Sequence, residues 1–388
     1  MGSARRIGRL VRWGLAIAAL AFVVGMVPVR DRCWDPRAPA STALAVTREG
    51  TGCVLHVPSG DVRIGAAECA KLECEPGVAS TFARARFEIL LAVLALYAVG
   101  TLAWAARWRA LLAFAGIDMT VLHVWRVTTE AQAAGILLPG GIGGDALRIA
   151  SVIARPARPG EERAPAAIVV ASVLLDRAIG LSVIAAVAAT LGFALGGLQA
   201  GALAYALASI PLGVAIGVVV LRKAPVYRIG WLMRGRLAGV VRPVLDYVRD
   251  PRAPGAIARA AALSSVVAGV QFATIRGIIL ALGAVPTQGH EKWVYVGSAM
   301  AFIVGAVPAL PGGWGTTDAA FVFFLGKAGL AAGAALAVCL TYRLFWYLLG
   351  VVGAVLQIAR PRAVEGRPGL KPEDDGVREG LRQEGPPP

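Results

Sequence analysis

Two short motifs interrupt apolar parts of the chain, and each places an aspartate just after a cluster of glycines. The first reads Leu-Pro-Gly-Gly-Ile-Gly-Gly-Asp over residues 138–145, and the second reads Leu-Pro-Gly-Gly-Trp-Gly-Thr-Thr-Asp over residues 310–318. Proline and clustered glycine end a helix, because proline lacks an N–H donor and glycine loses the most backbone entropy on ordering. Irregular backbone inside a membrane must be covered by protein or line a water-filled cavity. Both motifs are therefore predicted to line a site.

The chemistry that suits these motifs is the binding of an anion such as phosphate. A helix that starts at such a break presents free N–H groups and the positive end of its dipole, and glycine lets the backbone approach a ligand closely. Arginines within apolar segments could bind phosphate oxygens through paired hydrogen bonds. The candidate substrate-binding residues are Gly140, Gly141, Gly143, Gly144, Asp145, Arg148, Asp176, Arg177, Arg276, Gly312, Gly313, Gly315, Thr316, Thr317, Asp318 and Arg343.

Structural roles for the same residues stay open at this point. Asp145 and Thr316 could be N-caps of the helices that follow the breaks. Asp176 and Arg177 could pair with other buried charges as a structural lock, although a charge inside a membrane is costly enough to suggest function first. Arg148 could extend its side chain to the inner interface.

Catalytic and cofactor sites are not indicated. The three histidines are scattered, and the sequence has no metal-ligand spacing, no Walker loop and no Gly-x-Ser-x-Gly elbow. We therefore expect no enzyme activity, no metal and no cofactor. The net charge of +15 is not accompanied by a recognisable nucleic-acid module, so we expect no nucleic-acid partner.

The composition indicates an all-α polytopic membrane protein. The chain of 388 residues is 57% hydrophobic and its mean hydropathy is +0.67, well above that of soluble domains. Basic residues concentrate before the first apolar segment, in the loops after alternate segments and at the C-terminus. By the positive-inside rule, both termini are predicted to be cytoplasmic. The membrane that we expect is a bacterial inner membrane.

Four of the five cysteines lie in one polar segment, at Cys33, Cys53, Cys69 and Cys74. A local, even cluster of cysteines is typical of an oxidising compartment, where two disulfides stabilise a segment too small for its own core. The sequence leaves three pairings open, with zinc as the alternative. Short strands are expected at residues 42–47, 53–57 and 62–64, around a turn at residues 59–61.

The apolar segments and breaks divide the chain into six parts. An apolar anchor at 13–29 is favoured over a cleaved signal peptide, and residues 87–106 form the next span. The two broken segments, 121–153 and 294–325, are too short on each side of the break to cross a membrane, so each is predicted to be a re-entrant hairpin. The predicted parts are 1–29 (N-terminus and first helix), 30–86 (extracytoplasmic insert), 87–221 (first repeat), 222–259 (basic loop), 260–358 (second repeat) and 359–388 (disordered tail).

The order span, hairpin, span with a buried arginine occurs twice and in opposite orientation. This order predicts inverted repeats, which in transporters place the substrate site at the repeat interface near the middle of the membrane. No enzyme hypothesis predicts such symmetry.

The two glycine motifs, together with Leu175-Asp176-Arg177 and Tyr342-Arg343-Leu344, resemble the flippase-like transmembrane family that includes the N-terminal half of lysylphosphatidylglycerol synthase. The resemblance covers roughly residues 87–358. The second motif departs from the family pattern at residues 316–318, where a basic residue and Glu are expected, and the cysteine insert is not a family feature. Because few residues follow residue 358, we expect no aminoacyl-transferase domain like that of the synthase.

The resemblance implies movement of a lipid between membrane leaflets without aminoacylation. We expect a flippase for a lipid with a phosphate-containing head group, such as a phospholipid, an aminoacyl- or glycolipid, or a polyprenyl phosphate. An accessory subunit that binds a partner through the insert, and an enzyme acting on lipid phosphates, are the alternatives. A homo-oligomer and an extracytoplasmic partner are left open.

Overall fold

The computed structural model describes residues 29–34, 44–49, 52–57, 60–137, 142–155, 165–196, 202–223, 238–306 and 314–359. Several sequence predictions fall outside these ranges. They are the first apolar helix, the tail, and the glycines 140, 141, 312 and 313.

The insert contains a five-stranded antiparallel sheet in the order β4-β3-β2-β1-β5. Its elements are β1 (Asp31–Trp34), β2 (Leu44–Glu49), β3 (Gly52–Val57), β4 (Gly60–Ile64), α2 (Ala66–Cys69), β5 (Glu73–Glu75) and α3 (Val78–Ala83). Three of the strands, β2, β3 and β4, overlap the three that the sequence predicts. The sequence pattern missed β1 and β5, because strands of four and three residues are too short to show alternation.

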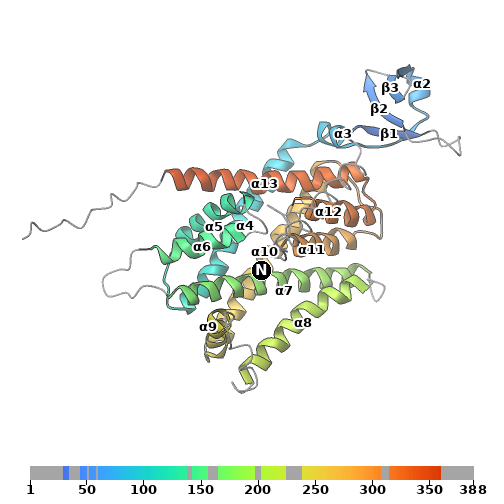
Figure 1. Ribbon diagram of the computed structural model, residues 1–388. Coiled ribbons are helices and arrows are strands. Elements are labelled where there is room, and N and C mark those ends of the chain that lie inside the picture. The colour runs from blue at the N-terminus through green and yellow to red at the C-terminus, as the bar shows by residue number, and fades with distance from the viewer. Residues whose placement is uncertain are drawn as a thin grey trace, which may run out of the picture.

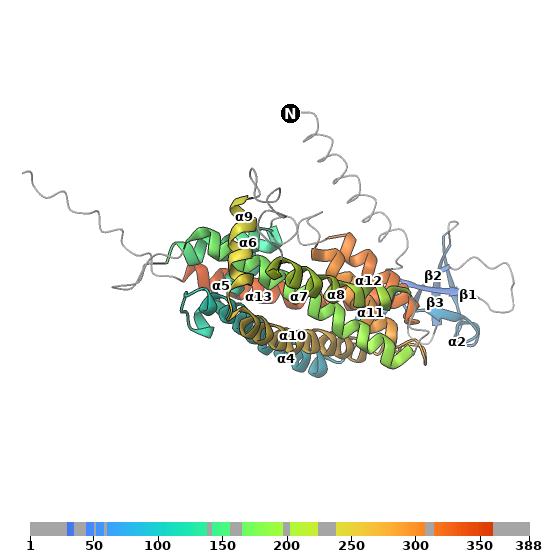
Figure 2. The ribbon, with the colours of Figure 1, turned by 90° about the horizontal axis from the view of Figure 1, so that it is seen from below.

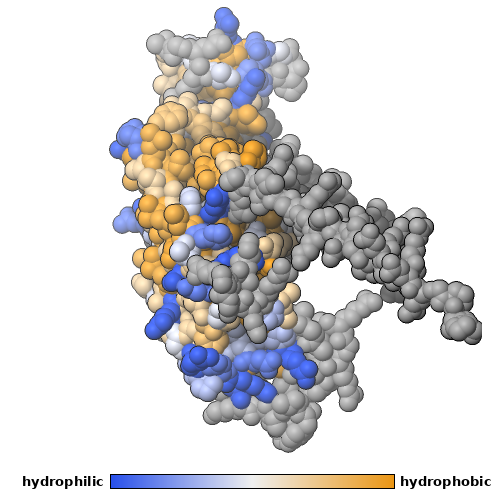
Figure 3. Space-filling view, turned by 90° about the vertical axis from the view of Figure 1, so that its left-hand side faces the viewer, coloured by the Kyte–Doolittle hydropathy of each residue, from blue (hydrophilic) through white to orange (hydrophobic). Residues whose placement is uncertain are grey.

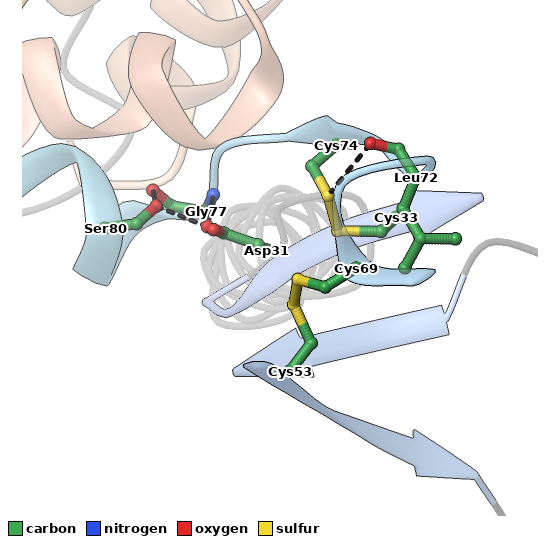
Figure 4. Close-up of a disulfide and its surroundings, with 8 residues drawn as sticks. All are labelled: Asp31, Cys33, Cys53, Cys69, Leu72, Cys74, Gly77 and Ser80. Atoms are coloured by element: carbon green, nitrogen blue, oxygen red, sulfur yellow. Dashed lines mark hydrogen bonds between the residues drawn. A yellow bond between two sulfur atoms is a disulfide. The ribbon is translucent and has the colours of Figure 1, made fainter. Parts of the chain in front are cut away.

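Two disulfides hold this small sheet together, as the cysteine cluster predicted (Figure 4). Cys33 of β1 pairs with Cys74 of β5, and Cys53 of β3 pairs with Cys69 of α2. Cys33 and Cys53 form a small buried core with Val46. The structure thereby selects one of the three pairings that the sequence left open.

The insert is attached to the helical part of the chain at its base. The carboxylate of Asp31 accepts the backbone N–H of Gly77 at 2.8 Å and also the hydroxyl of Ser80 (Figure 4). Gly333 lies so close to residues 76 and 77 that a Cβ placed there would meet the carbonyl oxygen of Pro76 at 2.5 Å. The insert therefore packs directly against the helix that contains Gly333.

The rest of the described chain is helical. The helices are α4 (Phe87–Phe114), α5 (Val121–Leu137), α6 (Ile142–Ile153), α7 (Ala166–Gly196), α8 (Ala202–Lys223), α9 (Ala238–Arg249), α10 (Ala253–Ala281), α11 (Lys292–Ala306), α12 (Thr316–Lys327) and α13 (Ala332–Ile358). Of these described helices, four are long and apolar enough to cross a membrane, namely α4, α7, α10 and α13. Figure 3 shows a hydrophobic stretch of surface between hydrophilic side chains at the top and the bottom of the view.

Helix α4 differs from the prediction in a way that matters for the site. The predicted span ended at residue 106, directly before Arg107. The helix instead continues to Phe114, because Leu111 and Leu112 are completely buried and extend the apolar face past Arg107. Arg107 therefore lies inside the helix, with only 6% of its surface exposed.

The long and short helices repeat in the same order. The first set is α4, α5, α6 and α7, and the second set is α10, α11, α12 and α13 (Figure 1). The contacts repeat as well: α5 packs against α13 and α11 packs against α7, while α4 and α10 pack against each other (Figure 2). Within each set the two short helices also pack side by side.

Corresponding helices of the two sets run in opposite directions. Helices α4 and α13 begin beside the insert, since α4 follows α3 and Gly333 lies near the start of α13. Helix α10 ends there, where the N–H of Arg86 donates to the carbonyl of Ala281 at 2.8 Å. Helix α7 also ends there, because Gly196 lies against the side chain of Lys292 at the start of α11. The pairs α4/α10 and α7/α13 are thus antiparallel.

Candidate functional site

The first polar cluster lies where α4, α6 and α7 meet. Arg107 donates from Nε to Oδ1 of Asp176 at 2.7 Å, and Arg148 donates from NH2 to Oδ2 of the same carboxylate at 3.1 Å. Arg177 donates from Nε to Oδ2 of Asp145 at 3.0 Å, and NH1 of Arg148 lies 3.5 Å from Oδ1 of Asp145. Three arginines and two aspartates thus form one connected network.

Neighbouring side chains support this network. The guanidinium of Arg148 lies 4.0 Å from the ring centre of Trp108, which is a favourable cation–π distance. The indole N–H of Trp108 donates to the hydroxyl of Ser172 at 3.2 Å, and Arg107 donates to Ser264 of α10 at 3.3 Å. Because buried charges repay their desolvation only when such hydrogen bonds are satisfied, these contacts are needed to hold the arginines inside the protein.

The second polar cluster joins α12 to α13. Arg343 binds Asp318 in bidentate fashion, with Nε donating to Oδ1 at 2.6 Å and NH2 donating to Oδ2 at 2.9 Å. Asp318 also accepts the N–H of Gly315 at 2.8 Å, and the thiol of Cys339 donates to it at 3.0 Å. The guanidinium of Arg343 lies 4.6 Å from the ring centre of Trp314.

The two clusters contain the same pair at the same position of each helix set. Arg177 and Arg343 each lie 11 residues after the first residues of α7 and α13, Ala166 and Ala332. Each binds an aspartate in the first turn of the preceding short helix, Asp145 of α6 or Asp318 of α12. The side chains of Arg177 and Asp145 are 36% and 23% exposed, whereas those of Arg343 and Asp318 are 6% and 4% exposed.

A cavity of about 290 Å³ lies between the two clusters. Its lining includes side chains from both helix sets, so that neither set encloses the cavity alone. The polar residues in that lining are Thr101, Trp104, Arg107, Asp176, Arg177, Ser264, Gln271, Thr317, Cys339, Tyr342 and Arg343. The aromatic rings of Tyr97, Phe302, Phe321 and Trp346 also line the cavity. The cavity can therefore hold both a charged group and an apolar chain of a ligand.

The structure brings together most of the predicted site residues that it describes. Asp145, Arg148, Asp176 and Arg177 form the first cluster. Gly315, Asp318 and Arg343 form the second, and Thr317 lines the cavity beside them. Gly143 is buried in α6. Gly144 allows α6 to approach α5, since a Cβ there would meet the carbonyl oxygen of Ala131 at 2.8 Å.

The N-cap alternatives are wrong. Helix α6 starts at Ile142, so Asp145 lies inside its first turn, and α12 starts at Thr316, so its N-cap is Gly315. Asp318 caps that end by accepting the N–H of Gly315. Arg148 is 3% exposed and paired with Asp176, so it does not extend to an interface.

Arg276 does not belong to either cluster. Arg276 is exposed on α10 and does not line the cavity. The apolar sequence around it predicted correctly that it lies within a helix but gave no information about the face on which it lies. The structure therefore does not bring Arg276 together with the other candidate residues.

The sequence pattern did not indicate Arg107, which pairs with Asp176 in the first cluster and lines the cavity. The signal was available, because Trp108 and the pair Leu111-Leu112 continue the apolar face of α4 beyond it. Ser264 and Gln271 of α10 were also missed, since isolated polar residues in an apolar helix carry no spacing signal.

Together, these features describe a helical membrane protein in which two sets of helices line a shared polar cavity. The comparison with known families agrees: the lysylphosphatidylglycerol synthase transmembrane region matches residues 77–353, and the chain belongs to this family. The family indicates a membrane protein involved in lipid handling. No curated protein and no solved structure matches the chain.

Proposed function

We propose that the protein is a lipid flippase that moves a lipid with a phosphate-containing head group between membrane leaflets. The observation that carries this proposal is the cavity of about 290 Å³, which both helix sets line and into which Arg107, Arg177 and Arg343 contribute cationic side chains. A flippase must replace the hydration of an anionic head group inside the membrane, and guanidinium groups do so through paired hydrogen bonds.

We further propose that the two helix sets are inverted repeats with re-entrant hairpins. The antiparallel directions of α4/α10 and α7/α13 support this proposal. Helices α6 and α12 have 12 residues each, about 18 Å of helix, which is shorter than the membrane core of about 30 Å. In this arrangement α5 and α6 enter from the side away from the insert, and α11 and α12 enter from the side of the insert.

The unequal exposure of the two equivalent ion pairs supports alternating access. The Arg177–Asp145 pair is partly exposed, whereas the Arg343–Asp318 pair is sealed. In the proposed cycle the hairpins exchange these roles, so that the cavity opens to one leaflet at a time. Movement would be downhill or ion-coupled.

The proposed orientation places the insert outside the cytoplasm and both termini inside, in a bacterial inner membrane. Disulfides in the insert favour an oxidising compartment. Basic residues such as Arg155, Arg222 and Arg252 lie near the helix ends that are remote from the insert, as the positive-inside rule requires.

The proposal is transport rather than catalysis, and reconstitution tests it. The purified protein is placed in liposomes with fluorescent phosphatidylglycerol, and dithionite then measures how much of the inner-leaflet lipid reaches the outside. We expect Arg177→Ala and Arg343→Ala to abolish movement while leaving the disulfides intact. The control is Arg276→Ala, which removes an exposed arginine of α10 that does not line the cavity. Unchanged movement in both site variants would reject the site.

An accessory subunit is the second candidate, and the close packing of residues 76 and 77 of the insert against Gly333 of α13 favours it. This alternative predicts that deletion of residues 33–74 removes function in cells, while the core shows no lipid movement in liposomes. A phosphatase assay on the same preparation tests the lipid-phosphate enzyme.

A further inference from the structure

We infer that the cavity selects a head group that carries one net negative charge, and that this charge is held by the first cluster. The inference rests on the proposed function and adds the charge class of the lipid. It follows from the balance of buried charges and from the kind of polar atoms that lack partners.

The first cluster has one positive charge in excess. Among the described acidic residues, Arg107, Arg148 and Arg177 pair with Asp145 and Asp176 alone. Arg107, Arg148 and Asp176 are each at most 6% exposed, so water and salt compensate little of this excess. An uncompensated charge in a buried site favours the binding of an opposite charge.

The other buried charges of the described helical core are balanced in pairs. Arg343 is paired with Asp318, and Arg126 is paired with Glu130 at 3.0 Å. The short segments 138–141 and 307–313 contain no charged residue. The excess therefore stays with the first cluster, of which Arg107, Arg177 and Asp176 line the cavity.

The polar atoms around the cavity point to the same ligand class. Nε1 of Trp104 lines the cavity, is buried and has no hydrogen-bond partner among the described residues, and this atom is a donor. Nε of Arg148, in the first cluster but outside the cavity wall, is a second buried donor without such a partner. Both carboxylate oxygens of Asp176 already accept from arginines, as do both of Asp318. A ligand in the cavity thus meets the unfilled donor of Trp104, whereas an ammonium group would have to compete with arginines for the carboxylates of Asp176 and Asp318.

This arrangement fits a phosphodiester with one negative charge and no ammonium group. A zwitterionic or cationic head group would leave its ammonium unpaired, and a dianionic phosphate would reverse the excess. A free anion such as phosphate or chloride shares this chemistry, so the test must separate it from a lipid.

The experiment measures lipid retention by native mass spectrometry. The full-length protein in mild detergent is equilibrated with equal amounts of phosphatidylglycerol, which is monoanionic, and phosphatidylcholine, which is zwitterionic. We expect wild type to retain phosphatidylglycerol in about tenfold excess, the ratio expected for one charged hydrogen bond. Retention that ignores lipid charge would overturn the inference.

Three variants test the charge balance itself. Arg177→Gln makes the first cluster neutral and should remove the preference, whereas Asp145→Asn raises the excess and should increase it. The double variant Arg177→Gln with Asp145→Asn restores one excess positive charge and should restore the preference. If the double variant stays unselective, charge balance is not the cause and the inference fails. Arg276→Gln is the control, because it removes an exposed arginine of α10 that does not line the cavity, and it should bind as wild type does. Elution profiles and intact disulfides report folding.

Further measurements distinguish a lipid head group from a free anion, and the charge preference from the flippase activity. Retained phosphatidylglycerol in excess inorganic phosphate or chloride would support a lipid head group, and its displacement would overturn that assignment. Charge-selective binding without lipid movement in liposomes would keep this inference and reject the flippase. Binding that does not depend on lipid charge, together with movement of both lipids, would reject this inference and keep the flippase.

Discussion

Gly180 of α7 lies directly against the guanidinium of Arg107 of α4. A Cβ placed at Gly180 would meet NH1 of Arg107 at 2.7 Å and would approach Cζ and NH2 to 3.3 Å. Arg107 uses this space to reach Asp176 on one side and Ser264 on the other. The absence of a side chain at Gly180 is therefore a condition for placing the central cation of the cavity between three helices.

Replacing Gly180 with alanine should displace Arg107 and impair lipid movement. The added methyl group occupies the space of the guanidinium, so the hydrogen bonds to Asp176 and Ser264 cannot both remain. We expect a loss of about 1–3 kcal/mol in stability, the usual effect of overpacking, and a loss of selective lipid retention. Thermal unfolding in detergent and the liposome assay measure the two effects. Gly269→Ala is the control, because a Cβ at this exposed glycine of α10 meets nothing within 4 Å; equal behaviour of the two variants would contradict the prediction.

The Arg343–Asp318 pair should show strong coupling between its two members. Both side chains are almost completely buried, so Arg343→Gln leaves a carboxylate without its cation and should cost about 3–5 kcal/mol. Asp318→Asn should cost a similar amount, whereas the double variant should be more stable than either single variant. Unfolding of all four proteins in the same detergent measures the coupling. Additive effects would mean that the pair is not a structural unit.

The fold was predictable where local sequence determines it. Proline and glycine end α5 at Leu137 and precede α12 at Thr316, close to the predicted breaks, and the long apolar segments became α7 and α13. Strand β5 and the cysteine pairing depend on contacts between distant residues, which no local pattern carries. The end of α4 was missed because one arginine inside a helix looks like the start of a loop.

The candidate site was predictable as a set of residues but not as an arrangement. The sequence marked Asp145, Arg177, Asp318 and Arg343 as residues that bind a substrate. The structure shows that they bind each other, and a sequence without its tertiary contacts gives no partner for a buried charge. The same limitation hid Arg107, whose role depends on a glycine one helix away.

Substitution of Arg276 should leave lipid movement unchanged. Arg276 is exposed on α10 and does not line the cavity. Arg276→Gln therefore removes a charge that lies outside the candidate site. The liposome assay at equal protein density measures this, with Arg177→Gln as the variant that should fail. A loss of movement in Arg276→Gln as large as that in Arg177→Gln would restore the role that the sequence suggested.

Asp31 should hold the sheet of the insert against residues 77–80, which pack on α13, without affecting the disulfides. Its carboxylate is 7% exposed and accepts hydrogen bonds from Gly77 and Ser80, so Asp31→Ala leaves a buried N–H without an acceptor. The expected cost is about 1–3 kcal/mol, seen as faster hydrogen exchange at residues 77–80, while peptide mapping still finds Cys33–Cys74 and Cys53–Cys69. Asp61→Ala is the matched control, because it removes an exposed carboxylate of the same sheet, whose ion-pair partner among the described residues is His56 at 2.7 Å. If exchange at residues 77–80 were equally slow in both variants, the attachment would depend on the packing of Gly333 against residues 76 and 77 instead.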